Sequence, residues 1–284
     1  MPASAVPIRQ AIFAVLDVET TGLEPHARVI EIACVRLQGF RELGRLQSLI
    51  HPGIPIPPVA TSVSGIDDAM VSGAPPFSQV WPALANLLED AVLVAHNAPF
   101  DLHYLSNEKK RAGGSPWQGP VLDTLRLARN VLELPAYSLP ELRASLALES
   151  GPSHRALADV LTTAALLKLL VERLAPGVRT LPELLQAQLP VPLPWEEATR
   201  FGVPEPTVET LADAARRGQW VAIDYESRAG TRRWLLHPLG LERNGRLTYL
   251  LGQVEPTRET RTFRTDRIRG ASLALPPQPG NPTA

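Results

Sequence analysis

Four acidic side chains in this sequence, Asp17, Glu19, Asp101 and Asp159, lie in three separate segments, each near the end of a strand-like pattern or the start of a helical one. Asp17 and Glu19 end the apolar run AIFAVL, and their i, i+2 spacing points both carboxylates to one face of a strand. Asp101 follows the run AVLVA in the first turn of an expected helix, and Asp159 lies over a turn into a helix expected at about 155–174. A fold that gathers such carboxylates loses stability through their repulsion unless cations neutralise them.

The residue types in this set favour hard cations. Carboxylates without cysteine suit Mg²⁺ or Mn²⁺ rather than Zn²⁺, and two such ions about 4 Å apart form a clamp for in-line phosphoryl displacement. His154 stands five residues before Asp159, so the two cannot share a helical face and His154 must reach the site from a loop. Its neutral imidazole suits a general base. Asp101 alone could simply complement a helix dipole, but the three segments together favour a catalytic site.

Apolar periodicity predicts an α/β domain over residues 1–174. Three strands precede alternating helices and strands, an order that predicts a mixed sheet flanked by helices. The expected elements are strands at 11–19, 28–37, 44–50 and 91–95, and helices at 77–89 and 155–174. The carboxylates then fall at strand ends and on the closing helix.

The motifs DVETTG, HNAPFD and HRALADV resemble, in this order, those of the DEDDh family of 3′–5′ exonucleases, which includes the proofreading epsilon subunit of bacterial DNA polymerase III. The resemblance covers residues 8–174 and implies an RNase H-like fold. It implies two Mg²⁺ or Mn²⁺ ions held by Asp17, Glu19, Asp101 and Asp159, with His154 as the base. The histidine branch is favoured because Arg155 stands where the sister branch has tyrosine.

The same resemblance implies contacts with the end of the substrate strand. Thr20 and Thr21 would offer backbone N–H and hydroxyl groups to the terminal sugar, and Phe100 would pack near the terminal base. The stretch TSVSGIDDAMVSGAPPF resembles a further family block that lies beside the terminal nucleotide. The predicted substrate-binding residues are therefore Thr20, Thr21, Gly65, Ile66, His96, Asn97 and Phe100. For Ile66 and Phe100, packing in the core is an equal alternative.

The composition shifts at residues 175–206, where prolines surround a single helical pattern, LPELLQAQL, and we interpret this segment as a semi-rigid linker. Residues 188–193, QLPVPL, resemble the short peptide by which bacterial replication proteins bind the sliding clamp. The resemblance is loose, and it predicts a clamp or polymerase contact through the linker.

Residues 207–284 form a third part with different chemistry: twelve arginines and no lysine against eight acidic residues, a net charge of +4. The overall charge is −1, so this basic part is the natural place for phosphate contacts, although a solvated charged face is the ordinary alternative. The runs WVAIDYES, RRWLLHPLGLE and RLTYLLGQV predict strands, and Asn244–Gly245 predicts a hairpin.

This series resembles the WYL domain, a small SH3-like β-barrel found in bacterial regulators and nucleic-acid-processing proteins. The tryptophan of the family's name is replaced by Thr248. The resemblance implies binding of nucleic acid or a nucleotide ligand, and the expected contacts are Tyr225, His237, Arg261 and Arg264. Arg267 is expected to pair with Asp266.

Two classes of function follow. The first is a metal-dependent 3′–5′ exonuclease that releases nucleoside monophosphates from single-stranded DNA or DNA 3′ ends in repair or proofreading, with short RNA as the alternative substrate. The second is a regulator that responds to nucleic acid or a nucleotide through the WYL-like domain. The N-terminal residues lack a long apolar core, and no apolar run reaches membrane-spanning length, which predicts a cytoplasmic protein without membrane contact.

Overall fold

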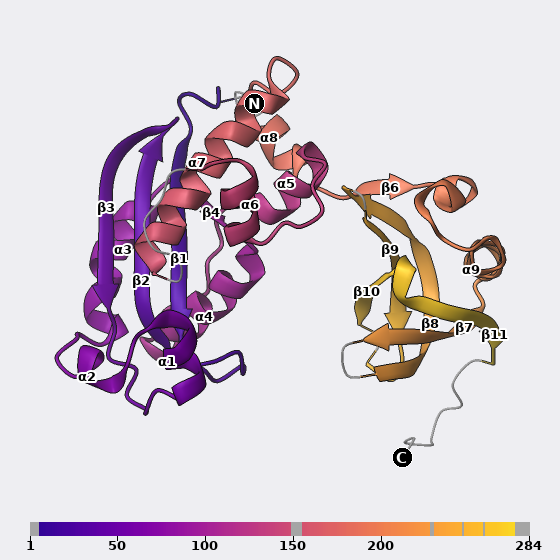
Figure 1. Ribbon diagram of the computed structural model, residues 1–284, viewed down its shortest axis with the longest axis horizontal. Coiled ribbons are helices and arrows are strands. Elements are labelled where there is room, and N and C mark those ends of the chain that lie inside the picture. The colour runs from indigo at the N-terminus through magenta and orange to yellow at the C-terminus, as the bar shows by residue number, and fades with distance from the viewer. Residues whose placement is uncertain (1–5, 149–154, 228–229, 246, 258, 276–284) are drawn as a thin grey trace. The chain divides into compact units, whose positions relative to one another are not determined.

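The computed structural model describes residues 6–148, 155–227, 230–245, 247–257 and 259–275. The chain divides into two units, Met1–Leu189 and Pro190–Ala284, and each has its own hydrophobic core (Figure 1). Among the described residues, no helix has the length and apolar character needed to cross a membrane.

The first unit contains a five-stranded mixed sheet with the strand order β3-β2-β1-β4-β5. The strands β1, β2 and β3 are antiparallel neighbours, while β4 pairs parallel to both β1 and β5. Their bounds are β1 Ile12–Thr20, β2 Val29–Gln38, β3 Arg41–Leu49, β4 Val92–Ala95 and β5 Val121–Asp123. The central strands are apolar on both faces because helices cover both sides of the sheet.

Eight helices of the described chain belong to this unit: α1 Pro58–Ser64, α2 Asp68–Val71, α3 Phe77–Leu88, α4 Ala98–Arg111, α5 Thr124–Val131, α6 Leu139–Ser145, α7 Ala156–Leu174 and α8 Leu181–Ala187. Helices α3 and α4 pack on the face of β1 that carries Ala14 and Leu16. Helices α5 to α8 pack on the other face, with Phe13 and Val15. Because side chains alternate along a strand, the face covered by α7 is also the face of Asp17.

The predicted mixed sheet flanked by helices is confirmed. Five of the six expected strands and helices lie within one residue of their predicted ends, and the strand expected at 44–50 begins three residues earlier, at Arg41. Cys34 is buried in β2 as a small apolar side chain.

The expected linker at 175–206 is not a linker in the structure. Helix α8, capped by Thr180 and Glu183, packs into the core of the first unit through Leu184. The second unit begins directly at Pro190, and strand β6, Val191–Leu193, pairs with its sheet. Prolines stand here at helix starts and on a short strand, where a missing N–H is tolerated, so a high proline content did not indicate an unstructured segment.

The second unit is an antiparallel sheet with the order β10-β9-β8-β7-β11, to which β6 adds beside β8. The other strands are β7 Trp220–Ser227, β8 Gly230–Asn244, β9 Leu247–Val254, β10 Thr260–Arg264 and β11 Ile268–Ala274. Two 3₁₀ helices, η1 Trp195–Phe201 and η2 Thr265–Arg267, also belong to this unit. Helix α9, Glu205–Arg217, packs on the sheet through Leu211. The sequence analysis missed α9, although Pro206 near its start and Gly218 at its end, with φ 62°, are ordinary helix boundary signals.

Candidate active site

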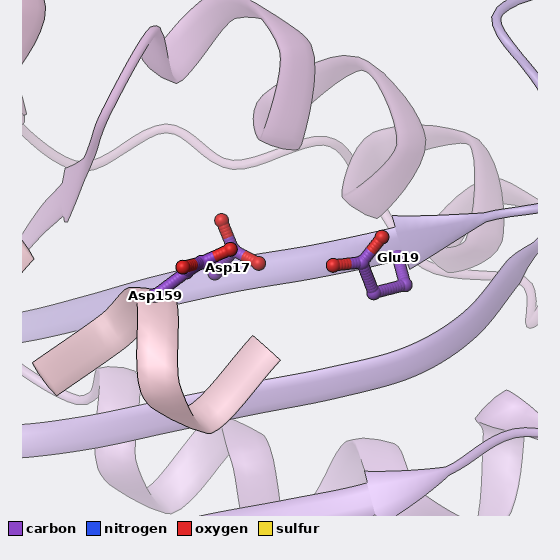
Figure 2. Close-up of side chains that lie close together, drawn as sticks. All are labelled: Asp17, Glu19 and Asp159. Atoms are coloured by element: carbon purple, nitrogen blue, oxygen red, sulfur yellow. The ribbon is translucent and has the colours of Figure 1, made fainter. Parts of the chain in front are cut away.

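The end of β1 and the start of α7 bring three carboxylates together (Figure 2). Asp17 and Glu19 point from one face of β1, and Asp159 reaches them from the first turn of α7. One ligand oxygen from each side chain lies within 4.8 Å of the others, and all three side chains are half-buried. This arrangement matches the donor set that hard divalent cations prefer.

Asp101 approaches the same strand from the opposite side of the sheet. Strand β4 pairs with β1 only as far as Val15, and beyond this point the Val18 amide donates to the Asp101 carboxylate at 3.1 Å. Asp101 is 2% exposed, and it lies in the first turn of α4, whose N-cap Asn97 has a left-handed φ of 68°. The structure thus holds Asp101 beside β1, although it is not one of the three closest carboxylates.

Burial and mutual repulsion disfavour the charged forms of these acids. Burial, followed by the charges of Asp101, Glu19 and Asp159, raises the pKa of Asp17 well above its ordinary value. Burial and the nearby Asp159 carboxylate raise the pKa of Glu19 to about 7. Four acids held this close fit a cation site, because bound divalent ions would remove the repulsion.

The stability of the metal-free protein is expected to fall as pH rises from about 5 to 8. Between the ordinary pKa of Glu19, 4.5, and its folded value of about 7, the unfolded chain is ionised while the folded carboxyl still holds its proton. The folded state therefore binds more protons, and the free energy of unfolding decreases as pH rises through about 7.

Urea unfolding at several pH values in EDTA measures this slope, and added Mn²⁺ should raise stability most at the alkaline end. A metal-free protein that gained stability over this range would contradict the assignment.

His154, the expected base, lies outside the described residues, so its role remains a prediction. The following residue, Arg155, is the N-cap of α7 and has an extended backbone.

The structure uses several of the predicted substrate-binding residues for its own contacts. The Thr21 amide donates to the Arg28 carbonyl oxygen at 2.8 Å, and the Thr21 hydroxyl accepts from the Arg28 amide at 3.0 Å. The Thr20 hydroxyl donates to the Gly22 carbonyl oxygen. These groups close the loop that follows β1, so the backbone amide of Thr21 is not available to a sugar.

Ile66 was expected at the substrate, but its side chain is fully buried with Ile30 and Ile56 in a small core under α1. Ile66 thus packs in the core, and its contact with substrate stays a prediction. The neighbouring Gly65 is exposed, with a left-handed φ of 71° that ends α1 and open space around it. Of this pair, only Gly65 is exposed to solvent.

His96 and Asn97 lie between β4 and α4, and Phe100 lies in the first turn of α4. Both His96 ring nitrogens are occupied, one by the Thr124 hydroxyl at 3.0 Å and one by the Tyr137 carbonyl oxygen at 2.9 Å, and burial lowers its pKa. His96 thus has partners within the fold, and its contact with substrate stays a prediction. Asn97 is exposed, and Phe100 is half-buried with its ring edge-on to Tyr104.

In the second unit, Tyr225 and Trp234 each pack edge-on against Phe263. Arg261 lies over the Trp234 ring, 5.2 Å from its centroid, and Arg232 lies over the same ring at 4.3 Å. We call Arg232, Trp234 and Arg261 the arginine–tryptophan cluster. The sequence analysis named Arg261 but missed the other two members, although the sequence RRW combines charge and an aromatic ring.

The remaining two expected contacts of this unit have partners. Arg264 forms a bidentate ion pair with Asp266, with distances of 3.0 and 2.6 Å. The Arg264 hydrogen bonds are the main cause of the lowered pKa of Asp266, and the charge of Arg267 contributes to it, so Arg267 is a second, weaker partner of this carboxylate. His237 is half-buried and edge-on to Trp220.

The clamp-like peptide is divided between the two units. The Gln188 side chain accepts from the Asp123 amide at 2.6 Å and donates to the Val121 carbonyl oxygen at 2.8 Å. Leu193 is buried in the core of the second unit. Clamp binding by this peptide would require both residues to leave these contacts, so the structure argues against it.

The fold and the acidic cluster define a nuclease of the exonuclease class. Residues 14–167, more than half of the chain, match the exonuclease family model RNase_T, and the chain belongs to this family. Residues 206–273 match the WYL domain.

Three similar proteins illustrate the relationship. The chain is 37% identical over 176 residues to a PolC-type DNA polymerase III of Thermotoga maritima, covering 61% of this chain and 13% of that protein. It is 33% identical over 164 residues to the DNA polymerase III epsilon subunit of Aquifex aeolicus, covering 57% and 81%. It superposes with a TM-score of 0.50 and 28% identity on exonuclease X in complex with 5′-overhanging duplex DNA, covering 62% and 99%. The chain spans less than a third of the length of several other curated relatives.

Proposed function

We propose that this protein is a metal-dependent exonuclease that removes nucleoside monophosphates from the 3′ end of single-stranded DNA. The observation that carries the proposal is the convergence of Asp17, Glu19 and Asp159 within 4.8 Å in a member of the exonuclease family. The relatives include polymerase III proteins, and a neighbouring structure contains DNA, which favours DNA over RNA and a role in repair or proofreading.

In this proposal, Asp17, Glu19, Asp101 and Asp159 hold two Mg²⁺ or Mn²⁺ ions. When bound, such ions stabilise charge on the transferring phosphoryl group and make water more acidic. His154 accepts a proton from the attacking water. The water oxygen bonds to phosphorus, and the bond from phosphorus to the 3′ oxygen breaks. The shortened strand keeps a 3′ hydroxyl, and the released nucleotide keeps the 5′ phosphate.

Polarity and polymer type are tested together with matched DNA and RNA strands, each labelled at the 5′ end. One set has a free 3′ hydroxyl and the other a nuclease-resistant 3′ cap. We expect a ladder of shortened DNA strands from the free end and protection by the cap. Cleavage that ignores the cap would contradict an exonuclease that acts from the 3′ end, and faster loss of RNA would name RNA as the substrate.

We propose that the WYL domain holds the single strand through the arginine–tryptophan cluster. A guanidinium over an aromatic ring keeps its outer edge free for phosphate, and both arginines are exposed. Arg261 also pairs with Glu259 at 3.3 Å, an exposed contact that a phosphate could replace at little cost.

Removing both cluster arginines is expected to weaken binding of long single strands by about tenfold and to make its salt dependence shallower. The variant is Arg232→Ala/Arg261→Ala, measured by fluorescence anisotropy over a salt series. The matched control, Arg216→Ala/Arg217→Ala, removes the same charge from the exposed face of α9. If binding by wild type and by the cluster variant depends equally on salt, the arginine–tryptophan cluster is not part of the binding site.

A further inference from the structure

Strand β2 lies beside β1 and contributes none of the three clustered carboxylates, yet it contains a buried acid. Glu31 stands directly opposite Glu19 in the β1–β2 register, on the face covered by α7, and its side chain is 1% exposed. Like charges at opposite positions of two strands are unfavourable, so this acid requires a local partner.

Glu31 finds its partners at the start of α7. Its carboxylate accepts from Arg155 Nε at 3.1 Å and Nη2 at 2.8 Å, and from the Ala156 amide at 3.1 Å. Gln47 on β3 donates a further hydrogen bond at 2.9 Å. The N-cap residue of α7 makes no side-chain capping bond of its own. Glu31 therefore caps α7 from the neighbouring strand, one turn before Asp159.

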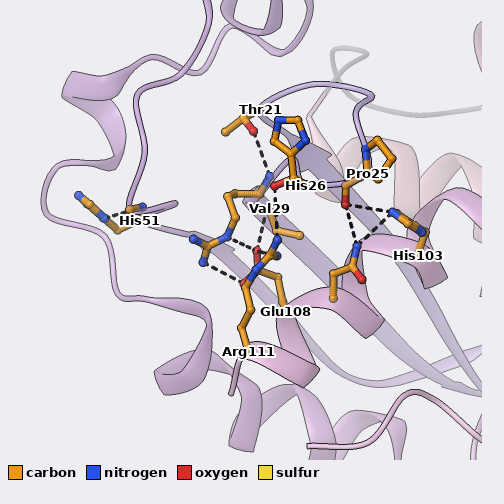
Figure 3. A network of polar contacts seen from close by, with 11 residues as sticks. Thr21, Pro25, His26, Val29, His51, His103, Glu108 and Arg111 are labelled. Carbon is orange, nitrogen blue, oxygen red and sulfur yellow. Dashed lines mark hydrogen bonds and ion pairs between the residues drawn. The ribbon is translucent and has the colours of Figure 1, made fainter. Parts of the chain in front are cut away.

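A second buried acid joins the other ligand-bearing helix to the same strand (Figure 3). Glu108 on α4 is 2% exposed and accepts from Arg28 Nε at 2.7 Å and Nη2 at 3.0 Å. It also accepts from Arg111 at 3.1 Å and from the Val29 amide, at the first residue of β2, at 3.4 Å. Glu108 lies seven residues, about two turns, beyond Asp101 and thus on a similar face of α4.

The Arg28 backbone extends this connection to β1. As described above, it exchanges two hydrogen bonds with Thr21, two residues after Glu19. Helix α4, the start of β2 and the end of β1 are thus joined through one arginine.

We propose that the pairs Glu31–Arg155 and Glu108–Arg28 are positioning pairs that set α7 and α4 against β2, and thereby place Asp159 and Asp101 relative to Asp17. A buried ion pair is a poor source of stability compared with apolar packing, but the planar fork of arginine fixes distance and orientation. Ligands on separate helices need such support, since displacements near 1 Å can cost catalysis about 100-fold. This inference rests on the proposed function, because it assigns the pairs to the same metal site.

The test compares Glu31→Gln, Arg155→Lys and Glu108→Gln in the full chain. Each keeps the side chain's approximate size but loses one acceptor or the arginine fork. We expect kcat to fall by about 10- to 100-fold with KM within about threefold, and Mn²⁺ affinity to fall by about tenfold. The matched controls are Glu42→Gln and Arg45→Lys, from an exposed bidentate pair on β3, and both should stay within about twofold of wild type.

Thermal unfolding in EDTA separates positioning from folding. If a glutamine variant does not fold, Arg155→Lys still tests the inference, because it keeps the positive charge beside Glu31 and removes only the planar, bidentate guanidinium. Wild-type kcat and Mn²⁺ affinity in that variant, or in folded glutamine variants of lowered stability, would overturn the inference. The Mn²⁺ titration needs no turnover, so an inactive wild-type protein would contradict the proposed function while the affinity shifts would still test the pairs.

Discussion

Replacing Asp17 with Asn is expected to lower turnover to below about 1% of wild type while the fold is retained. Besides burial, the charges of Asp101, Glu19 and Asp159 all raise the pKa of Asp17, so this carboxylate is close to each of the other expected metal ligands. The same burial and repulsion that raise its pKa make its charge unfavourable without cations. The metal-free Asn variant should therefore be at least as resistant to heat as wild type at pH 8.

Single-turnover cleavage and thermal unfolding in EDTA measure the two effects of this substitution. Asp90→Asn is the matched control, because Asp90 is exposed and its φ of 53° suits asparagine equally well. Residual turnover well above 1% would contradict the role of Asp17. If the variant is inactive only because it unfolds, its thermal stability in EDTA will be lower than that of wild type, which contradicts the expected result.

Replacing His154 with Ala is expected to slow turnover by about 10²- to 10⁴-fold, the usual contribution of a general base. Mn²⁺ affinity should stay near the wild-type value, because the expected metal ligands are the carboxylates. His51→Ala, which removes an exposed histidine, serves as the control. A wild-type rate in His154→Ala would exclude the residue as the base.

The positions of the clustered carboxylates within their own strand and helix were predictable, because side chains repeat at fixed spacings along a strand or a helix. The i, i+2 spacing of Asp17 and Glu19 determined that they share a face of β1, and the structure confirms this. Asp159 was predicted slightly more than one turn into a helix at about 155–174, and the structure places it in the first turn of α7.

Contacts between distant segments were not predictable in the same way. Thr21 pairs with Arg28 and Ile66 packs with Ile30, and in both cases a tertiary partner determines whether a side chain is available. The packing of residues near α1 against β2 thus buries the Ile66 side chain, which sequence spacing alone could not predict.

The burial of Glu31 could also have been predicted from the sequence. An acid inside IEIACV, where every neighbour is apolar, predicts a buried charge that needs a partner. The partner itself, Arg155, lies 124 residues away, and only the packing of α7 on β2 brings the two together. The RRW sequence of the arginine–tryptophan cluster was a similar, shorter-range signal.

The most direct test of the central claim follows 5′-labelled single-stranded DNA with purified wild-type protein in Mn²⁺, in EDTA, and in EDTA followed by excess Mn²⁺. The account predicts progressive shortening from the 3′ end in Mn²⁺, no shortening in EDTA, and recovery once Mn²⁺ is restored. Intact strands in Mn²⁺, or equal degradation in EDTA, would contradict a metal-dependent exonuclease centred on Asp17, Glu19 and Asp159.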